Sequence, residues 1–211
     1  MKKVAVIGSG SWGTALSTLL ASTSDEVIIW SREADVTESI NNEHVNCRHL
    51  SDSELPHNIV STTSEAEALT GVDAVVMAAP SAFLRSVCAA CAPYLDPEVD
   101  VLILSKGMEA GSHKLMHEVA ADELGNPARI AVLSGPNHAE EVIKQGISAA
   151  VIASEDAEVA KRFQALLYRP YFRTYVSSDV RGVEACAAAK NVVAIACGIA
   201  VGLGNGDNAL A

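Results

Sequence analysis

The sequence predicts an α/β fold: a doubly wound, mainly parallel sheet, followed by the start of an all-helical second domain. Short runs rich in Val and Ile alternate with helical patterns along most of the chain, which is typical of parallel strands joined by right-handed helical crossovers. These runs are apolar throughout, as expected for strands that are buried on both faces. Near residue 178 the alternation stops, and a long helical pattern follows with no further strand.

Each predicted strand and helix start has a local signal. Ser64 and Glu67 form a Ser-x-x-Glu capping box, and Ser81 and Ser154 each precede a helical pattern. The polar, irregular stretch 41–64 is predicted to be a surface loop. Strands are expected over residues 4–8, 27–30, 74–79, 101–104, 130–133, 149–153 and 172–176.

Composition and charge narrow the class of protein. The 211 residues are 49% hydrophobic and 19% charged, which is enough for one sizeable core. A formal net charge of −11 disfavours nucleic acid as a partner, because phosphate binding needs a basic surface. We expect no membrane span, since the apolar stretch 191–204 is shorter than the ~20 residues that a bilayer requires. Five cysteines, an odd number, favour free thiols and a cytoplasmic location.

A glycine motif follows the first predicted strand. Residues 8–13 read Gly-Ser-Gly-Ser-Trp-Gly and open a helical pattern, which is the context of a dinucleotide-binding turn in a Rossmann-type sheet. Gly8 would permit the tight turn, and Gly10 would let a pyrophosphate approach backbone N–H groups. Gly13 would allow close packing of helix on strand. A plain strand-to-helix turn is the alternative.

The end of the second strand bears on cofactor preference. A site specific for NAD places Asp or Glu there to bind the ribose 2′-hydroxyl, whereas this chain has Ser31, Arg32 and Glu33 after Trp30. The planar guanidinium of Arg32 suits a 2′-phosphate, so the sequence favours NADP over NAD. A solvated surface charge is the alternative interpretation of Arg32.

Three segments that contain lysine or glycine are candidates for contacts with a ligand. Lys106 and the segment 133–142 follow buried strands, and ligands of open α/β sheets bind at such carboxyl ends. Lys106 is equally well explained as a surface lysine. Lys190 lies in an otherwise uncharged helical pattern that runs from a cap at Ser178 or Asp179 to about Gly202. An ammonium in apolar surroundings is expected to have a lowered pKa.

Several of these segments carry a family resemblance. The chain contains GSGSWGTAL, AAPS, LSKG, LSGPNHAEEV and KNVVAIACGI with GLGNGDN, in that order. They resemble the bacterial NAD(P)-dependent glycerol-3-phosphate dehydrogenases across all 211 residues. The resemblance implies reversible reduction of dihydroxyacetone phosphate to sn-glycerol 3-phosphate with NAD(P)H, which supplies phospholipid synthesis.

The resemblance also implies roles for individual residues. Lys190 matches the catalytic acid/base, and Lys106, Gly135 and Lys190 match substrate contacts. Asn137 is a further candidate substrate contact, although Ser and Phe are commoner in the family at positions 137 and 138. Residues implied near the cofactor, besides the three glycines, are Ser11, Trp12, Arg32, Lys106 and Ala139, with Pro80 and Phe83 bordering the nicotinamide.

The domain organisation follows from the change of pattern near residue 178. We expect a dinucleotide-binding domain over residues 1–178 and the first helix of a truncated helical substrate domain over 179–211. The resemblance implies that an Arg-Asn pair beyond residue 211 grips the substrate phosphate. The chain as given is therefore expected to bind cofactor with almost no dehydrogenase activity, and a full-length homodimer is possible.

Two other functions fit part of the pattern. One is a related NADP-dependent dehydrogenase of hydroxy acids or acyl groups, and the other is a non-catalytic NADP-binding redox-sensing module, which needs no Lys190. No metal site is expected. Cys88 and Cys91 are interpreted as buried thiols, and His113 and His117 as one solvated helix face at i, i+4 spacing.

Overall fold

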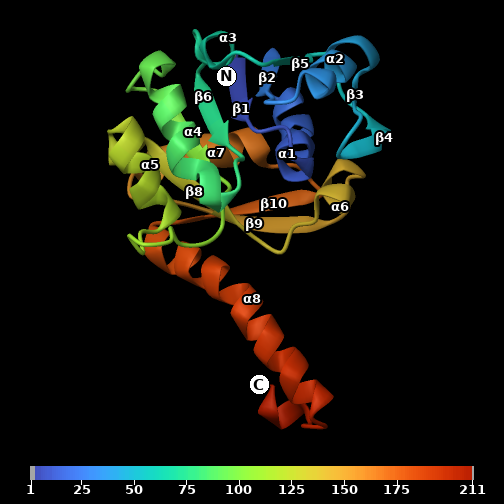
Figure 1. Cartoon of the computed structure of the whole chain (residues 1–211), viewed down its shortest axis with the longest axis vertical. Helices are drawn as coiled ribbons and strands as arrows, with labels where there is room; N and C mark the ends of the chain where they lie inside the picture. Colours follow the sequence, from blue (N-terminus) through green and yellow to red (C-terminus); the bar gives the residue numbers. More distant parts are fainter. Residues whose placement is uncertain (1–2, 211) are drawn as a thin grey trace.

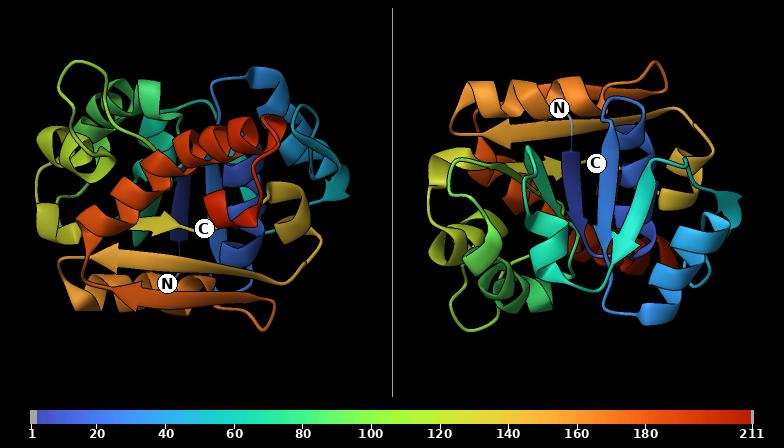
Figure 2. Two further views of the ribbon diagram at one scale, coloured as in Figure 1. Left: turned by 90° about the horizontal axis from the view of Figure 1, so that it is seen from below. Right: turned by 90° about the horizontal axis from the view of Figure 1, so that it is seen from above.

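The structure is a computed structural model, and it describes residues 3–210. It consists of an α/β body and one long helix that projects from the lower edge of the body, with the C-terminus near its far end (Figure 1). Viewed from below, this helix crosses in front of the body (Figure 2). The predicted doubly wound sheet followed by a C-terminal helix is confirmed.

The body is built on an eight-stranded sheet. Its strand order is β10-β9-β8-β7-β6-β1-β2-β5. Neighbouring strands are parallel except for the pair β8 and β9, which is antiparallel, so the sheet is mainly parallel as predicted. The strands are β1 (Lys3–Ile7), β2 (Glu26–Trp30), β5 (Ile59–Thr62), β6 (Ala74–Met77), β7 (Asp100–Ile103), β8 (Ile130–Ser134), β9 (Ser148–Ser154) and β10 (Phe172–Ser177).

Helices cover both faces of the sheet. One face packs against α1, α2, α6 and α7, and the other against α3, α4 and α5. Short 3₁₀ turns at Ser81–Phe83, Ala92–Tyr94, Pro127–Arg129 and Asp207–Ala209 join or follow these elements. The α-helices are α1 (Ser11–Ala21), α2 (Ala34–Glu43), α3 (Glu65–Leu69), α4 (Leu84–Cys91), α5 (Met116–Leu124), α6 (Ala139–Ile143), α7 (Ala157–Leu167) and α8 (Val180–Gly202).

The continuous apolar strands have a direct structural cause. In β1, Val4 and Val6 belong to the core beneath α1, whereas Ala5 and Ile7 belong to the core beneath α4. Successive side chains of a strand point to opposite faces, so a strand covered on both faces needs apolar residues at every position. The same packing explains the other central strands.

The prediction of a surface loop over residues 41–64 is wrong. This stretch contains an antiparallel pair, β3 (Val45–Asn46) with β4 (Leu50–Glu54), and the edge strand β5. In β5, Ile59 and Ser61 are buried while Val60 is exposed, because only one face of this edge strand is covered. A short, half-polar strand carries too weak an alternation to be recognised.

The helix starts agree only in part with the sequence signals. Ser64 caps α3 as predicted, since its hydroxyl accepts a hydrogen bond from the Glu67 backbone N–H at 3.3 Å. The cap of α7 is Asp156 rather than Ser154. The prediction that His113 and His117 share a helix face is wrong, because His113 lies in a turn with a φ of 58° before α5 begins at Met116.

Helix α8 begins where the sequence predicts. The Asp179 side chain accepts a hydrogen bond from the Gly182 backbone N–H at 2.8 Å, and the helix continues without interruption to Gly202. Its 23 residues have a mean hydropathy of 1.7 in the most apolar window, so length and composition alone would allow it to cross a membrane. The apolar stretch is thus longer than the sequence argument assumed, and the absence of a membrane span stays a prediction.

Candidate active site

The candidate site lies where the order of the strands reverses. β1 pairs with β2 on one side and with β6 on the other, and the loops after β1 and β6 diverge at this point. Ligands of open α/β sheets bind in such a crevice, at the carboxyl ends of the strands. The Gly8 backbone N–H donates to Trp30 O at 3.1 Å, and the Ala78 N–H donates to Ile7 O at 2.9 Å, so both loops are fixed to neighbouring strands.

The three glycines of the motif have three different surroundings. Gly8 has a φ of 124°, which favours glycine, and a Cβ there would lie 3.0 Å from Ala78 O. A Cβ on Gly13 would lie 2.3 Å from Gly8 O, so α1 can approach the turn only without a side chain there. Gly10 has no atom within 4 Å of a Cβ position, and it stands at the N-cap of α1. The open space at Gly10 faces the end of a helix that attracts anions.

A cleft of about 360 Å³ opens beside this turn. It brings together five of the predicted cofactor residues, from the ends of β1, β2 and β6. Arg32 and Phe83 reach it with exposed side chains. The residues that line the cleft are Gly8, Ser9, Gly10, Trp30, Arg32, Glu33, His49, Ala78, Ala79, Pro80, Phe83 and Val87.

Five predicted cofactor residues do not line this cleft, and one of them, Lys106, lies beyond the end of β7. Ser11 and Gly13 lie in the first turn of α1, and Trp12 packs against the core beneath α1. Ala139 is buried at the start of α6, which packs against α1. Sequence reasoning missed His49, whose position depends on the β3–β4 hairpin; a lone histidine in a polar stretch gave no signal.

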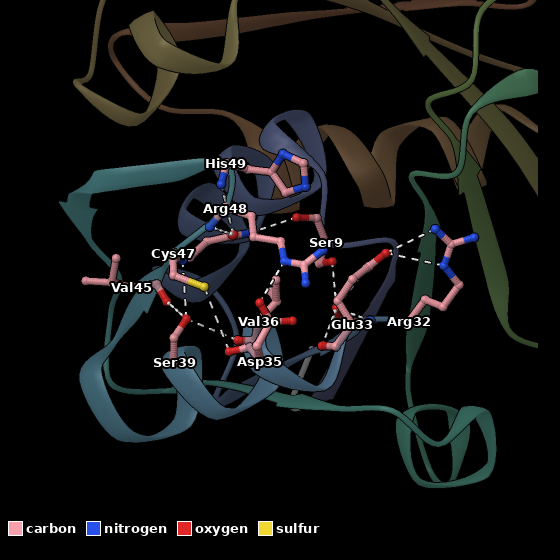
Figure 3. Close-up of polar contacts among 12 residues, drawn as sticks. Ser9, Arg32, Glu33, Asp35, Val36, Ser39, Val45, Cys47, Arg48 and His49 are labelled. Atoms are coloured by element: carbon pink, nitrogen blue, oxygen red, sulfur yellow. Dashed lines mark hydrogen bonds and ion pairs between the residues drawn. The ribbon is translucent and has the colours of Figure 1, made fainter.

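At the end of β2 a cation and an anion lie side by side. Figure 3 shows Arg32 and Glu33 pointing toward each other, with the Arg32 guanidinium 3.1 Å from the Glu33 carboxylate. The Arg32 side chain is 80% exposed and that of Glu33 25%. The Ser31 hydroxyl, which shares a 2.7 Å hydrogen bond with Ser9, is 3.5 Å from the other Glu33 oxygen. This corner offers a carboxylate for a 2′-hydroxyl and a guanidinium for a 2′-phosphate.

The adjoining hairpin adds a second ion pair to this corner. Arg48 Nε donates to Asp35 Oδ2 at 2.7 Å, and His49 follows Arg48 in the chain (Figure 3). The hydrogen bond from Arg48 lowers the pKa of Asp35, and the same bond raises the pKa of Arg48. The pair ties the hairpin to the first turn of α2.

The predicted substrate residues gather at the next strand ends. Lys106 Nζ donates to Gly135 O at 2.9 Å, which joins the loops after β7 and β8. Partial burial lowers the pKa of Lys106, and the nearby positive charge of Lys190 lowers it further. Lys106 and Gly135 are therefore joined by a hydrogen bond, and the charge of Lys190, 84 positions further along the chain, acts on Lys106.

Asn137 has an orientation that leaves one polar atom without a partner. Its amide Nδ2 donates to Ala149 O at 3.0 Å. Its Oδ1 is buried and accepts no hydrogen bond from any described residue. A Cβ on Gly135 would lie 2.5 Å from this oxygen and 2.5 Å from the backbone oxygen of Ala149, and the backbone contact makes glycine at 135 a steric requirement of the loop.

Lys190 lies in a part of α8 that is exposed in the described chain. Lys190 and Asn191 are both exposed, and so are the apolar side chains that follow them in α8. Val192 is 68% exposed and Ile195 64%. The helix is apolar, but over this part no described element packs against it.

The Cys88 and Cys91 thiols are buried in α4, as the sequence predicts. Burial raises the pKa of each to about 12, so neither is a reactive thiolate near neutral pH. Within residues 3–210, no three His, Cys, Asp or Glu side chains gather as metal ligands.

Comparisons with known proteins show the family of the chain. The family described as NAD-dependent glycerol-3-phosphate dehydrogenase N-terminus matches residues 3–160, and the corresponding C-terminus family matches 179–211. A glycerol-3-phosphate dehydrogenase [NAD(P)+] of Streptomyces griseus is 47% identical over 207 residues, covering 98% of this chain and 62% of that protein. One of Thermobifida fusca is 46% identical, covering all of this chain and 63% of that protein.

Solved structures give the same result. A glycerol-3-phosphate dehydrogenase of Coxiella burnetii superposes with a TM-score of 0.88 at 36% identity, covering 99% of this chain and 64% of that one. One from Saccharomyces cerevisiae gives 0.89 at 33% identity, covering 99% and 65%. The chain thus spans somewhat less than two thirds of the length of these relatives. Because the family match covers most of the described residues, the chain belongs to the NAD-dependent glycerol-3-phosphate dehydrogenase family.

Proposed function

We propose that the chain binds NADP or NAD in the cleft beside the glycine turn and carries the catalytic lysine of a glycerol-3-phosphate dehydrogenase. The proposed reaction reduces dihydroxyacetone phosphate to sn-glycerol 3-phosphate, and runs in reverse as an oxidation. The observation that carries the proposal is the hydrogen bond that joins Lys106 to Gly135 at the carboxyl-end edge of the sheet, where the charge of Lys190 also acts on Lys106.

The cleft fits a dinucleotide at its phosphate end. Gly10 leaves open the volume that a side chain would fill, at the N-terminus of α1, where unpaired backbone N–H groups favour a pyrophosphate. Arg32 and Glu33 lie at the ribose end, and Pro80 with Phe83 lie at the end of β6. The residues present therefore suit the group. When bound, the nicotinamide supplies or accepts the hydride.

The two lysines suit the chemistry at the carbonyl. As hydride reaches C2 of the ketone, negative charge develops on its oxygen, and the Lys190 ammonium stabilises this charge and donates its proton. In the reverse direction the Lys190 amine accepts the hydroxyl proton. Lys106, held by Gly135 O, presents a second positive charge to an anionic substrate. Asn137 Oδ1 is an unused acceptor beside this loop.

The domain assignment is part of the same proposal. Residues 1–178 form the dinucleotide-binding domain, and 179–211 begin the substrate domain; of the two family matches, one ends at residue 160 and the other begins at residue 179. Free thiols at all five cysteines support a cytoplasmic location. A homodimer stays a prediction.

The test separates cofactor binding from turnover. The chain is titrated with NADPH and NADH by nicotinamide fluorescence, and then assayed with dihydroxyacetone phosphate. A chimera is assayed in parallel, in which residues 1–211 are followed by the part of the Streptomyces griseus relative beyond its match. Binding by both proteins and turnover mainly by the chimera are expected. Absence of binding of both NADPH and NADH, or an inactive chimera that binds either cofactor, contradicts the proposal.

A non-catalytic, redox-sensing module is the other function that this fold supports. Such a module needs the glycine turn but has no use for Lys106, held by Gly135 at the strand ends, or for Lys190. Cofactor binding without turnover in the chimera would favour it. Turnover of a hydroxy acid, but not of glycerol 3-phosphate, would favour a related dehydrogenase.

Arg32→Ala is expected to raise the Kd for NADPH about tenfold or more, because one charge-assisted contact to the 2′-phosphate is lost. The Kd for NADH is expected to change less than twofold. Glu33→Gln is expected to lower the Kd for NADPH, since it frees Arg32 from its ion pair, and to raise that for NADH. Fluorescence titration measures all four constants. Arg173→Ala, an exposed arginine on β10, is the matched control, and an equal change for both cofactors would rule out the 2′-phosphate contact.

A further inference from the structure

The most deeply buried charged contact of α8 joins it to α5 of the α/β body. The Glu184 side chain is 6% exposed and that of His117, on α5, is 13% exposed. The His117 backbone N–H donates to one Glu184 oxygen at 3.1 Å, and the His117 ring Nδ1 pairs with the other. One carboxylate is thus held by two groups of the same residue.

The contact between Glu184 and His117 lies in the first two turns of α8, where it fixes the direction of the helix. Val180 and Glu184 are buried in α8, whereas the residues from Ala189 to Ile195 are exposed. Lys190 follows Glu184 by six residues, or about 9 Å of helix rise. Its position relative to Lys106 therefore depends on the angle at which the first two turns of α8 are fixed.

The charges around His117 strengthen the contact. Burial alone would lower the pKa of His117, but the hydrogen bond and charge of Glu184, with the charges of Glu118 and Glu155, raise it above its ordinary value. Breaking a buried pair is costly because it leaves the remaining charge without compensation. Arg181 pairs with Glu118 at 3.3 Å, but the Arg181 side chain is 78% exposed, so that pair is a weak tether.

We propose that Glu184 and His117 are positioning residues for Lys190: their buried contact holds α8 so that the Lys190 ammonium stays close to Lys106. The significance of this position for catalysis rests on the proposed function. The position of Lys190 can be tested independently of the proposed function, because it changes a pKa that is measured without turnover. This is the pKa of Lys106, which Lys190 lowers.

The test measures the pKa of Lys106 by NMR of the chain with ¹³C-methylated lysines, assigned with Lys106→Arg. Lys190→Gln is expected to raise this pKa, because a neighbouring positive charge is removed. Glu184→Ala is expected to raise it as well, to the value found with Lys190→Gln. In the double variant the two rises should not add. The sign is diagnostic, since loss of a negative charge acting directly on Lys106 would lower its pKa.

Controls separate positioning from loss of structure. Glu118→Ala removes a neighbouring carboxylate of α5 and is expected not to raise the pKa of Lys106. NADPH titration shows whether the body is folded, and His117→Ala, which removes the ring partner of Glu184, replaces Glu184→Ala if that variant does not bind. An unchanged or lowered Lys106 pKa in the folded variant overturns the inference. An inactive chimera with the expected pKa values overturns the proposed function alone.

Discussion

Gly13→Ala is expected to destabilise the chain, whereas Gly10→Ala is expected to leave its stability nearly unchanged and to abolish tight NADPH binding. A Cβ at residue 13 would stand 2.3 Å from the Gly8 carbonyl oxygen, a backbone atom that cannot move without opening the turn. Overpacking of this kind costs about 1–3 kcal/mol, or more where backbone must shift. It outweighs the gain of up to about 1 kcal/mol that alanine brings to a helix.

The effect of Gly10→Ala is different because the space around it is open. Gly10 has a φ of −64°, which alanine adopts without strain, and no atom lies within 4 Å of the added methyl group. That methyl group would occupy the approach to the α1 N-terminus, so the Kd for NADPH should rise at least about tenfold, since the charged hydrogen bonds there would be lost.

Thermal unfolding and NADPH titration measure the two effects separately. A fall in Tm of at least about 3 °C is expected for Gly13→Ala, at about 2–4 °C per kcal/mol for a chain of this size. Gly198→Ala, an open position in α8, is the matched control and should alter neither quantity much. A Gly10→Ala chain that binds NADPH as the parent does would show that the pyrophosphate lies elsewhere.

Lys190→Ala is expected to lower kcat for dihydroxyacetone phosphate in the chimera by about 10²–10⁴-fold, because the group that protonates the carbonyl oxygen is lost. The Kd for NADPH should change less than twofold, since Lys190 does not line the cofactor cleft. Steady-state kinetics and fluorescence titration measure the two quantities.

Two further variants distinguish proton transfer from charge alone. Lys190→Arg retains a positive charge but does not release a proton near neutral pH, so it should remain strongly impaired. Lys161→Ala removes an exposed lysine of α7 and should leave kcat unchanged. If Lys190→Ala retains kcat within threefold of the parent chimera, the acid/base assignment is wrong.

The fold was predictable wherever one local rule decided the structure. β1 and the glycine turn could be recognised because burial on both faces requires continuous apolar residues and the turn requires glycine. The hairpin of β3 and β4 was not, since its polar strands have no periodic pattern and pair only with each other. The antiparallel pairing of β8 with β9 also has no local signal.

The candidate site was likewise predictable only in part. Gly8, Gly10 and Arg32 stand at strand ends that the pattern locates, and they line the cleft. The joining of Lys106 to Gly135 depends on two loops that only the finished sheet brings together. The contact of His117 with Glu184 spans 67 positions and reverses the interpretation of His117 as a solvated residue. Such contacts depend on tertiary packing, and the sequence pattern of a single segment does not predict tertiary packing.

The joint between α5 and α8 makes the helix a lever with a short working arm. Lys190 lies about 9 Å from the pivot at Glu184, so a swing of about 10° would displace its backbone by about 1.5 Å. The same swing would carry Gly202, about 27 Å from the pivot, through nearly 5 Å. A displacement of about 1 Å can cost a hundredfold in rate. Bending of the C-terminal end of α8 thus has little effect on the position of Lys190. Movement at the Glu184–His117 contact, in contrast, displaces Lys190 directly.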